Sequence, residues 1–493
     1  MSSRNDLTIF LLHFYQDKIV LKLHFYQDKN VKQQHFYQDN FVFSKKNINF
    51  AGTKKSNAMK RTVLEELYKW KEQKQHKPLI IRGARQTGKT WLMREFGKQK
   101  FAETVYINFE NEPGLKYLFK QDYNTTRIIT TIELYNGKKI DPANTLLIFD
   151  EIQSAEGGIT SLKYFCEDAP QYYIIAAGSL LGITLHQHTS FPVGKVTFLD
   201  LQPLTFSEFL IANGKELLLE AMQEQKWETI STFHLELINL LKTYFFVGGM
   251  PEVVQKWIDT NDFFEVRNTQ YDILRSYQAD FSKHAPKEQI PRLNMVWDSL
   301  PAQLSKENKK FIYGIIREGA RAKDFELAIM WLINCGLVSK SNRISTPHLP
   351  LKAYQDMQVF KLYMVDVGLL GALSGLDTKT IIDNQSIFTE FKGAMTEQFI
   401  MQELLPLKNE YIGYWTNERS TAEVDFVIQK KGNIIPIEVK AGENLKSKSF
   451  TLFCNKYQPS IAIKTSLLPY NSSDNTIKNI PLYGLSCFIN NYE

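Results

Sequence analysis

The stretch from residue 78 to residue 97 constrains this chain more than any other part of it. A short apolar strand, a glycine loop and a helix are predicted by its sequence, PLIIRGARQTGKTWLMREFG. The loop fits the phosphate-binding pattern G-x-x-x-x-G-K-[ST]. Its residues are Gly83, Ala84, Arg85, Gln86, Thr87, Gly88, Lys89 and Thr90. Backbone N–H groups of such a loop, with the positive end of the following helix, bind a β-phosphate. The sequence therefore predicts a nucleotide-binding site in an α/β fold.

Two residues of this loop have predicted roles in the chemistry. Lys89 is expected to reach the β- and γ-phosphates, and the Thr90 hydroxyl is expected to ligate Mg²⁺. The alternative, a glycine turn with a solvated lysine, is disfavoured because the strand and the helix lie where the motif needs them. The predicted cofactors are ATP and Mg²⁺.

A second apolar strand, residues 145–151, ends in two acids. Asp150 is expected to hold the Mg²⁺ shell, and Glu151 to polarise the attacking water. P-loop kinases and GTPases usually lack this second acid, so the pair favours an ATPase. The additional strand predicted at residues 104–110 fits the same branch of P-loop proteins. A solvated Asp-Glu turn is the alternative.

A third strand, residues 172–179, ends in Ser179. A polar residue at this position can sense the γ-phosphate. The alternative is a simple turn serine.

Composition limits the other functions. The first 58 residues hold nine Lys or Arg and four Asp or Glu, and the remaining residues hold 50 and 49, so most of the net charge of +6 lies at the N-terminus. A nearly neutral body gives no charge-based support for nucleic-acid binding. The four cysteines form no C-x-x-C pair, which favours a reducing cytoplasm over a disulfide or zinc framework. No apolar run is long enough to span a bilayer.

The N-terminal residues 1–58 carry a short repeat. The sequence HFYQD begins at His13, His24 and His35. An eleven-residue spacing can mark a right-handed coiled coil, but the residues between the copies keep no apolar seam. We expect a leader that is disordered or not native to the protein, with a functional appendage as the alternative. A helical pattern begins at Met59 and leads to the P-loop.

Five stretches together resemble a known family. They are GARQTGKT, LLIFDE, AAGSLLG, PVGKVTFLDLQPLTFSEFL and YFFVGGMPEVV. The chain from Met59 onward is similar to prokaryotic AAA-type ATPases of the archaeal-ATPase-like group, in which the ATPase is fused to a C-terminal domain of unknown function with a nuclease-like fold. The family usually has Gly-Arg where this chain has Gly194-Lys195. An arginine finger is therefore unsupported there, and Arg267 and Arg275 are weak substitutes.

The resemblance and the sequence pattern together divide the chain into five segments. The fold class is α/β, with a three-layer P-loop ATPase core followed by a helical lid, a winged-helix-like module and a nuclease-like domain. The winged-helix-like module is expected because a helix ending at Gly336 precedes a strand hairpin, and it serves either as a DNA contact or as a protein–protein spacer. The expected ranges are leader 1–58, ATPase core 59–205, lid 206–285, winged-helix-like module 286–380 and nuclease-like domain 381–493.

The sequence AEVDFVIQKKGNIIPIEVKAGE, residues 422–443, carries a second set of chemical groups. Two strands joined at Lys431-Gly432 place Asp425 opposite Glu438. The same pairing places Glu423 opposite Lys440, so all four side chains share one face.

This arrangement resembles the PD-(D/E)xK nucleases. The resemblance implies that Asp425 and Glu438 hold Mg²⁺ and that Lys440 stabilises the developing charge. Glu397 matches the acid that such folds often add upstream. The alternative is a hairpin with a polar face held by ion pairs. The nearby Lys430, Lys431, Lys440, Lys446 and Lys448 suit either phosphate contacts or a solvated rim.

Three functional hypotheses follow. The first is an ATPase that acts on nucleic acid through its C-terminal domain, and the second is a nucleotide switch whose nuclease-like domain is inactive and binds a partner. The third, a metabolic P-loop kinase, is disfavoured by Glu151. The expected partners are DNA and further copies of the chain, in the cytoplasm, with no membrane.

Overall fold

The computed structural model describes residues 59–178, 192–306, 310–376, 389–417, 421–442, 445–472 and 476–492. The chain divides into two compact units, residues 1–57 and 58–493, and the described residues all lie in the second. The predicted leader with its HFYQD copies and the predicted sensor Ser179 lie outside the described residues.

A five-stranded parallel sheet carries the P-loop. Its strands are β1 (Leu79–Arg82), β2 (Glu103–Asn108), β3 (Thr145–Asp150), β4 (Tyr173–Ala177) and β5 (Thr197–Asp200). The strand order is β2-β3-β4-β1-β5, and every pair is parallel. The strand predicted between the two motifs in the sequence, β2, lies at the edge, and β4 separates the P-loop strand from the acid-bearing strand.

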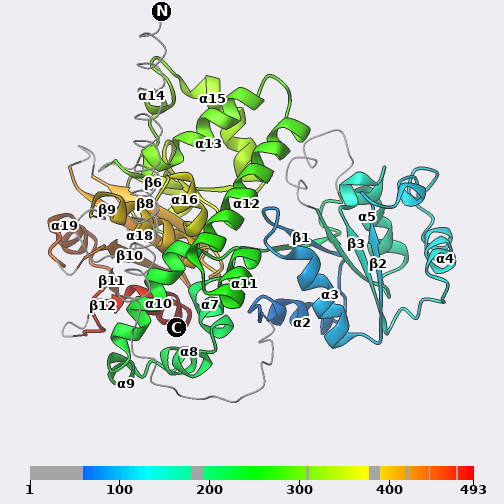
Figure 1. Ribbon diagram of the computed structural model, residues 1–493, viewed down its shortest axis with the longest axis horizontal. Helices are drawn as coiled ribbons and strands as arrows, with labels where there is room; N and C mark the ends of the chain where they lie inside the picture. The colour runs from blue at the N-terminus through cyan, green and yellow to red at the C-terminus, as the bar shows by residue number, and fades with distance from the viewer. Residues whose placement is uncertain are drawn as a thin grey trace, which may run out of the picture. The chain divides into compact units, whose positions relative to one another are not determined.

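Helices cover both faces of this sheet (Figure 1). On one face α2 (Leu64–Lys71) and α3 (Lys89–Lys100) pack against Ile81 and Ile148. On the other, α4 (Thr125–Asn136) and α5 (Gly158–Asp168) pack against the neighbouring strand residues, because successive side chains of a strand point to opposite faces. Two hydrophobic layers result, as predicted for a three-layer P-loop core.

Helices follow the parallel sheet in the range that the sequence assigned to a lid, and the lid itself stays a prediction. The helices of residues 206–284 are α7 (Phe206–Ala212), α8 (Glu216–Gln223), α9 (Trp227–Ser231), α10 (His234–Val247), α11 (Pro251–Thr260) and α12 (Phe263–His284). They are followed by α13 (Ile290–Leu304), α14 (Tyr313–Ile316) and α15 (Ala322–Asn334).

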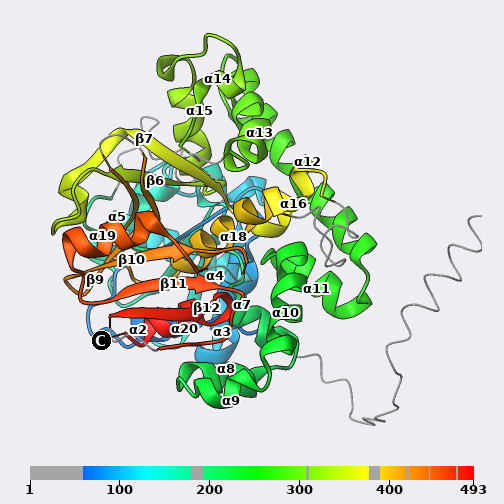
Figure 2. The same ribbon diagram turned by 90° about the vertical axis from the view of Figure 1, so that its left-hand side faces the viewer.

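A seven-stranded mixed sheet occupies the C-terminal part (Figure 2). Its strands are β6 (Val338–Ile344), β7 (Gln355–Met364), β8 (Tyr411–Thr416), β9 (Glu423–Lys430), β10 (Asn433–Val439), β11 (Ala462–Ser466) and β12 (Ile477–Pro481), in the order β12-β11-β10-β9-β8-β6-β7. Helix α18 (Thr389–Leu404) packs on one face and α19 (Lys448–Tyr457) on the other, while α16 (Val367–Leu373) and α20 (Leu485–Asn490) lie near α18.

The boundary expected at residue 380 falls between β7 and β8 in the chain, but both strands belong to this one sheet. The predicted helix α15 and the antiparallel hairpin of β6 and β7 are present. However, β6 also pairs in parallel with β8, so the hairpin is part of the C-terminal sheet. The sequence alone does not show this pairing, because β6 and β8 are far apart in the chain and the open edge of a strand can pair with a distant segment.

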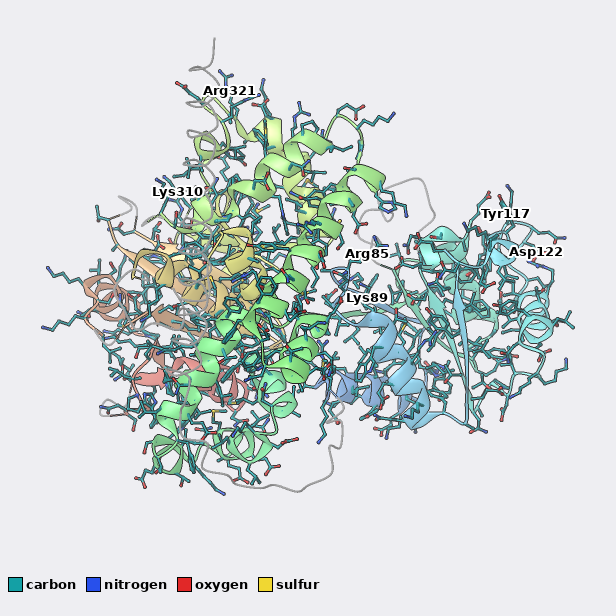
Figure 3. The ribbon with its side chains drawn as sticks, viewed as in Figure 1. Arg85, Lys89, Tyr117, Asp122, Lys310 and Arg321 are labelled. Carbon is teal, nitrogen blue, oxygen red and sulfur yellow. The ribbon has the colours of Figure 1, made fainter. Side chains whose placement is uncertain are left out.

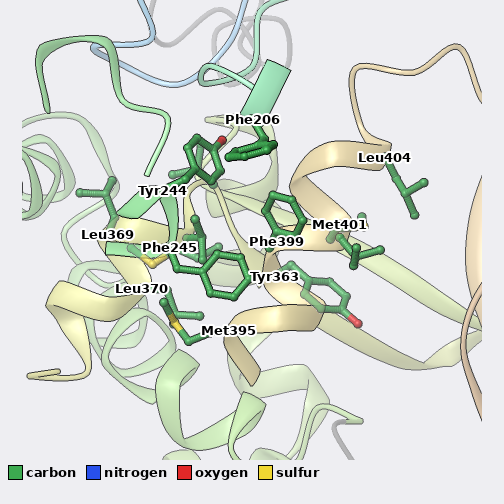
Figure 4. Close-up of a cluster of buried hydrophobic side chains, with 14 of the residues drawn as sticks. Phe206, Tyr244, Phe245, Tyr363, Leu369, Leu370, Met395, Phe399, Met401 and Leu404 are labelled. Carbon is green, nitrogen blue, oxygen red and sulfur yellow. The ribbon is translucent and has the colours of Figure 1, made fainter. Parts of the chain in front are cut away.

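An aromatic cluster joins the lid to the C-terminal sheet (Figure 4). The rings of Phe206, Tyr244 and Phe399 pack edge to face, with centroids 5.6 Å apart for Phe206 and Tyr244 and 5.9 Å for Tyr244 and Phe399. These residues come from α7, α10 and α18 and are almost completely buried. Their apolar contact ties three distant segments into one core.

A buried carboxylate reinforces this junction. Asp366 accepts hydrogen bonds from the backbone N–H of Gly249 at 2.6 Å and of Leu369 at 2.9 Å, and from the Gln402 amide at 3.2 Å. At Gly248, φ is +75° and an added Cβ would lie 2.1 Å from an Asp366 oxygen, so only glycine fits. The GGMP and VDVGLL stretches are therefore complementary parts of one contact.

Glu403 on α18 links the same junction to α7, and we predict a pH dependence from it. Its carboxylate accepts from the Phe206 N–H at 2.7 Å, and burial raises its pKa from 4.5 to about 7. The folded chain therefore keeps this proton up to about pH 7, whereas the unfolded chain releases it near pH 4.5. The free energy of unfolding should fall as pH rises through that window.

Glu403→Gln keeps the acceptor and has no proton to lose. Denaturant unfolding should show this variant to be more stable than the wild type by about 3 kcal/mol at pH 8, with little difference at pH 4.5. Glu220→Gln, at an exposed position on α8, should leave the profile unchanged. Parallel profiles for the wild type and Glu403→Gln would contradict the assignment.

Candidate functional site

The P-loop is closed tightly on itself. Gly83 has φ +148°, and a Cβ there would lie 2.3 Å from the Leu201 carbonyl oxygen. The fully buried Thr87 donates from its hydroxyl to the Ala84 carbonyl at 2.9 Å. The Arg61 guanidinium donates to the Thr87 carbonyl at 3.0 Å. These contacts fix the loop ahead of α3, which begins at Lys89.

Lys89 lies buried within the loop. Its ammonium donates to the carbonyl oxygens of Gly83 at 2.9 Å and Ala84 at 2.8 Å. Burial lowers the pKa of Lys89 to about 8, although the nearby Glu151 and Asp150 raise it. A bound phosphate would provide the counter-charge that these two carbonyl oxygens lack.

The two predicted Mg²⁺ ligands lie in contact. The Thr90 hydroxyl donates to Asp150 Oδ2 at 2.7 Å, and the Tyr106 hydroxyl donates to the same oxygen at 2.9 Å. Mg²⁺ binds in proteins through a few such oxygens together with substrate phosphates and water. Thr90 and Asp150 therefore fit the predicted metal, which would neutralise the phosphates of the nucleotide.

Sequence reasoning missed Tyr106. Its signal was the alternation of β2, which places this residue on the face opposite the buried Val105 and Ile107.

Glu151 follows the β3 strand in a left-handed backbone conformation, with φ +49° and ψ +44°. Such a conformation is costly for a residue other than glycine and is typical of functional sites. Gln153 donates from its side-chain amide to Glu151 Oε2 at 2.5 Å. Asp150 and Glu151 therefore have different partners, Thr90 and Gln153, and their separate roles stay predictions.

The candidates for an arginine finger are engaged elsewhere. Lys195 pairs with Glu167 at 2.8 Å. Arg267 is buried and donates to the Leu376 carbonyl at 2.9 Å. Arg275 pairs with Asp272 at 3.3 Å on its own helix.

The C-terminal hairpin has the predicted register. Asn433 pairs with Lys430 and Ile437 pairs with Phe426, with the intervening residues paired in the same register. Asp425 lies beside the opposite strand, because its Oδ2 accepts from the Val439 N–H at 2.7 Å. Glu423 and Lys440, which were predicted to face each other, each have another ionic partner.

A lysine from β7 lies among the predicted acids. Lys361 is fully buried, and its ammonium lies 2.5 Å from Glu423 Oε1 and 3.5 Å from Glu397 Oε2. Lys440 pairs instead with Glu438 of its own strand at 2.7 Å. Across the described ranges, no group of three or more His, Cys, Asp and Glu could hold a metal ion. The predicted nuclease residues Glu423, Glu438 and Asp425 thus meet two lysines and a backbone N–H group, and metal binding by Asp425 and Glu438 stays a prediction.

Three domain families match separate parts of the chain. Residues 75–210 match an AAA domain, which covers both ATPase motifs. Residues 238–380 match a domain of unknown function (DUF8612), and residues 392–485 match another (DUF4143). The first match confirms the prediction of an AAA-type ATPase domain. The descriptions of the other two families name no activity, so the nuclease-like character of the C-terminal domain stays a prediction.

Solved structures resemble the chain only distantly. The Walker-type ATPase paby2304 of Pyrococcus abyssi is 13% identical, covering 64% of this chain and 96% of its own, with a TM-score of 0.39. The Orc1 protein of Aeropyrum pernix in complex with DNA is 12% identical, covering 63% and 91%, with a TM-score of 0.26. Drosophila ORC bound to DNA is 12% identical, covering 64% and 95%, with a TM-score of 0.25. Likeness of this degree supports no conclusion on activity or partner.

No curated protein matches the chain. Among the helices that the structure describes, none is long and apolar enough to cross a membrane.

The geometry predicts different defects for two variants of the nucleotide site. Lys89→Ala should abolish tight ATP binding, because the loop loses its buried cation. Glu151→Gln should keep ATP binding and slow turnover by about 10²–10⁴-fold, because only the group that orients water is lost. Equilibrium binding of a fluorescent ATP analogue and phosphate release would measure the two effects. Equal loss of binding in both variants would show that the roles are wrongly assigned.

Proposed function

We propose that this chain is an ATP-hydrolysing AAA-type ATPase that works as a nucleotide-dependent switch, with α12 relaying the state of the P-loop to the C-terminal part. One observation carries the proposal. Arg85 of the P-loop is held by α12 through both its side chain and its backbone. Its guanidinium forms an ion pair with Asp280, and its carbonyl accepts from the Tyr277 hydroxyl at 2.9 Å. Arg85 and Lys89 are labelled together in Figure 3.

Further contacts support the relay. Lys283, near the end of α12, pairs with Glu110 at 3.1 Å, just beyond β2. The turn before β6 also approaches the loop, since a Cβ on Gly336 would lie 3.1 Å from the Ala84 nitrogen. The P-loop and its surroundings therefore contact segments that belong to the rest of the molecule.

ATP binding would disturb these contacts from within the P-loop. To meet the β- and γ-phosphates, the Lys89 ammonium has to leave the carbonyl oxygens of Gly83 and Ala84. These residues directly precede Arg85, so a change in their peptide orientation passes to the residue that α12 holds. On its other side, α12 reaches the GGMP junction through the Gln270 amide, which donates to the Val247 carbonyl at 3.0 Å.

Hydrolysis then resets the switch. In this proposal Glu151 activates the attacking water, and Thr90 and Asp150 hold Mg²⁺ beside the phosphates. Cleavage of nucleic acid is not part of this proposal, because the acids of the C-terminal sheet have protein partners.

The proposed relay predicts that substitutions on α12 stop ATP binding at the P-loop from affecting α16. In the Glu151→Gln background, ATP should alter hydrogen exchange in α12 and α16. Adding Asp280→Asn with Tyr277→Phe should remove the change in α16, while ATP affinity shifts by less than about 10-fold, since neither residue belongs to the phosphate-binding motif. Exchange measured by mass spectrometry with and without ATP tests this.

Asp272→Asn is the matched control, because Asp272 lies on the same helix and pairs only with Arg275 among the described ion pairs. It should leave the ATP response intact. An ATP response in α16 that survives the Asp280 and Tyr277 changes would refute the relay.

DNA binding is a second candidate function, favoured by a basic cavity beside α19. The cavity has a volume of about 840 Å³ and is lined by three lysines, Lys446, Lys448 and Lys464. Ser447 and Thr451 add hydroxyl groups. Lys464 is in register with Glu438 across β10 and β11, so the cavity adjoins the strand end where nuclease chemistry was predicted. Lysine ammonium groups and hydroxyls are the usual protein contacts to phosphate oxygens.

Replacing Lys446, Lys448 and Lys464 together by Gln should weaken binding of a labelled DNA duplex. The slope of log K against log salt should fall by up to about 3, one for each lost phosphate contact. The same change at Lys323, Lys352 and Lys456, which are exposed and outside the cavity, should have little effect. Equal effects of the two sets, or no binding by the wild type, would exclude this cavity as a DNA site.

A further inference from the structure

The KLYMVDVGLL stretch carries a buried charge that the ATPase function leaves unexplained. Lys361 opens this stretch on β7, and its side chain is completely buried. A lysine is almost never buried in this way unless its ammonium is paired. Here the ammonium lies 2.5 Å from Glu423 Oε1 and 3.5 Å from Glu397 Oε2.

Aromatic groups complete the surroundings of the ammonium. It lies 4.7 Å from the centroid of the Tyr414 ring. The Tyr363 hydroxyl donates to Glu397 Oε2 at 3.4 Å, which orients that carboxylate. Burial lowers the pKa of Lys361, but its neighbours raise it well above its ordinary value, in the order Glu397, Tyr363, Glu423 and Asp425. The lysine is therefore charged at any physiological pH.

Three acids of the nuclease-like hypothesis lie around Lys361, and that hypothesis assigned a divalent metal to one of them, Asp425. Glu397 was the expected upstream acid, Asp425 the expected ligand and Glu423 its neighbour on the same strand. Asp425 also accepts from the Val439 N–H at 2.7 Å. Glu438 pairs with Lys440, although its second oxygen, Oε2, is buried with no hydrogen-bond partner.

We infer that Lys361 is the resident cation of this acidic cluster and that its ammonium excludes a divalent metal ion from it. A metal ligated by Glu397 or Glu423 would lie within a few ångströms of a fixed positive charge, and the two would repel each other at close range. The lysine cannot withdraw into solvent, because its whole side chain is enclosed between β7, α18 and β9. The cluster therefore joins the β6–β7 hairpin to the rest of the sheet as an internal ion pair.

Mn²⁺ binding to the full-length protein without nucleotide tests the inference, with free Mn²⁺ followed by electron paramagnetic resonance. The wild type should have no Mn²⁺ site in the C-terminal cluster, so Asp425→Asn and Glu438→Gln should each bind as much Mn²⁺ as the wild type. Lys361→Met keeps the apolar stem and removes the charge, so it should gain one Mn²⁺ site per chain. Adding Asp425→Asn to Lys361→Met should weaken that new site at least 10-fold. Lys340→Met is the matched control, because Lys340 lies on β6, over the Phe360 ring and outside the cluster, and it should gain no site.

Each result decides the question. A wild-type Mn²⁺ site that is lost in Asp425→Asn or Glu438→Gln, but kept in Asp150→Asn, would overturn the inference by placing a metal in the C-terminal cluster. A folded Lys361→Met protein that gains no Mn²⁺ would overturn the assignment of the exclusion to this lysine. If Lys361→Met does not fold, Lys361→Gln, which also removes the charge but keeps a polar group, takes its place, and its gain or lack of a Mn²⁺ site decides in the same way.

Discussion

The contact on which the structure depends is the buried carboxylate of Asp366 with the GGMP loop. A carboxylate enclosed in apolar surroundings is stable only when hydrogen-bond donors surround it. Here the donors are the N–H groups of Gly249 and Leu369 and the Gln402 amide, from three different segments. The lid, α16 and α18 therefore cannot shift independently without leaving a buried charge unsatisfied. Because these segments are coupled, α12, which contacts the P-loop, acts on a rigid junction.

In the nucleotide site, the predicted ligands of ATP and Mg²⁺ contact other groups of the protein. Lys89 donates to loop carbonyls, and Thr90 donates to Asp150. Each of these bonds joins a predicted ligand of ATP or Mg²⁺ to a group that is a weaker partner than phosphate or metal. Binding thus exchanges internal contacts for stronger ones, and the exchange starts in the residues that precede Arg85. The proposed switch needs no further moving part than α12.

The sequence predicted the local features well because they depend on near neighbours. The P-loop, the Asp150-Glu151 pair and the register of the β9–β10 hairpin all follow from spacing within one motif. The partners that sequence reasoning missed are distant in the chain. Lys361 lies 36 residues from Glu397 and 62 from Glu423, and it comes from a segment expected to form a separate module. Strands β6 and β9 also belong to one sheet because of pairing between distant segments, which no local sequence pattern shows.

The acidic cluster shows why a motif of charged residues does not identify its cation. Carboxylates on neighbouring strands and a helix can surround a metal ion or an ammonium group, because both supply positive charge to the same oxygens. The two cases differ in where the counter-charge originates. Solvent supplies a metal, which one or two carboxylates can hold together with water and substrate oxygens, whereas a lysine needs a stem long enough to reach the carboxylates. In this chain the stem comes from β7, so the strand that completes the sheet also brings the charge that its acids require.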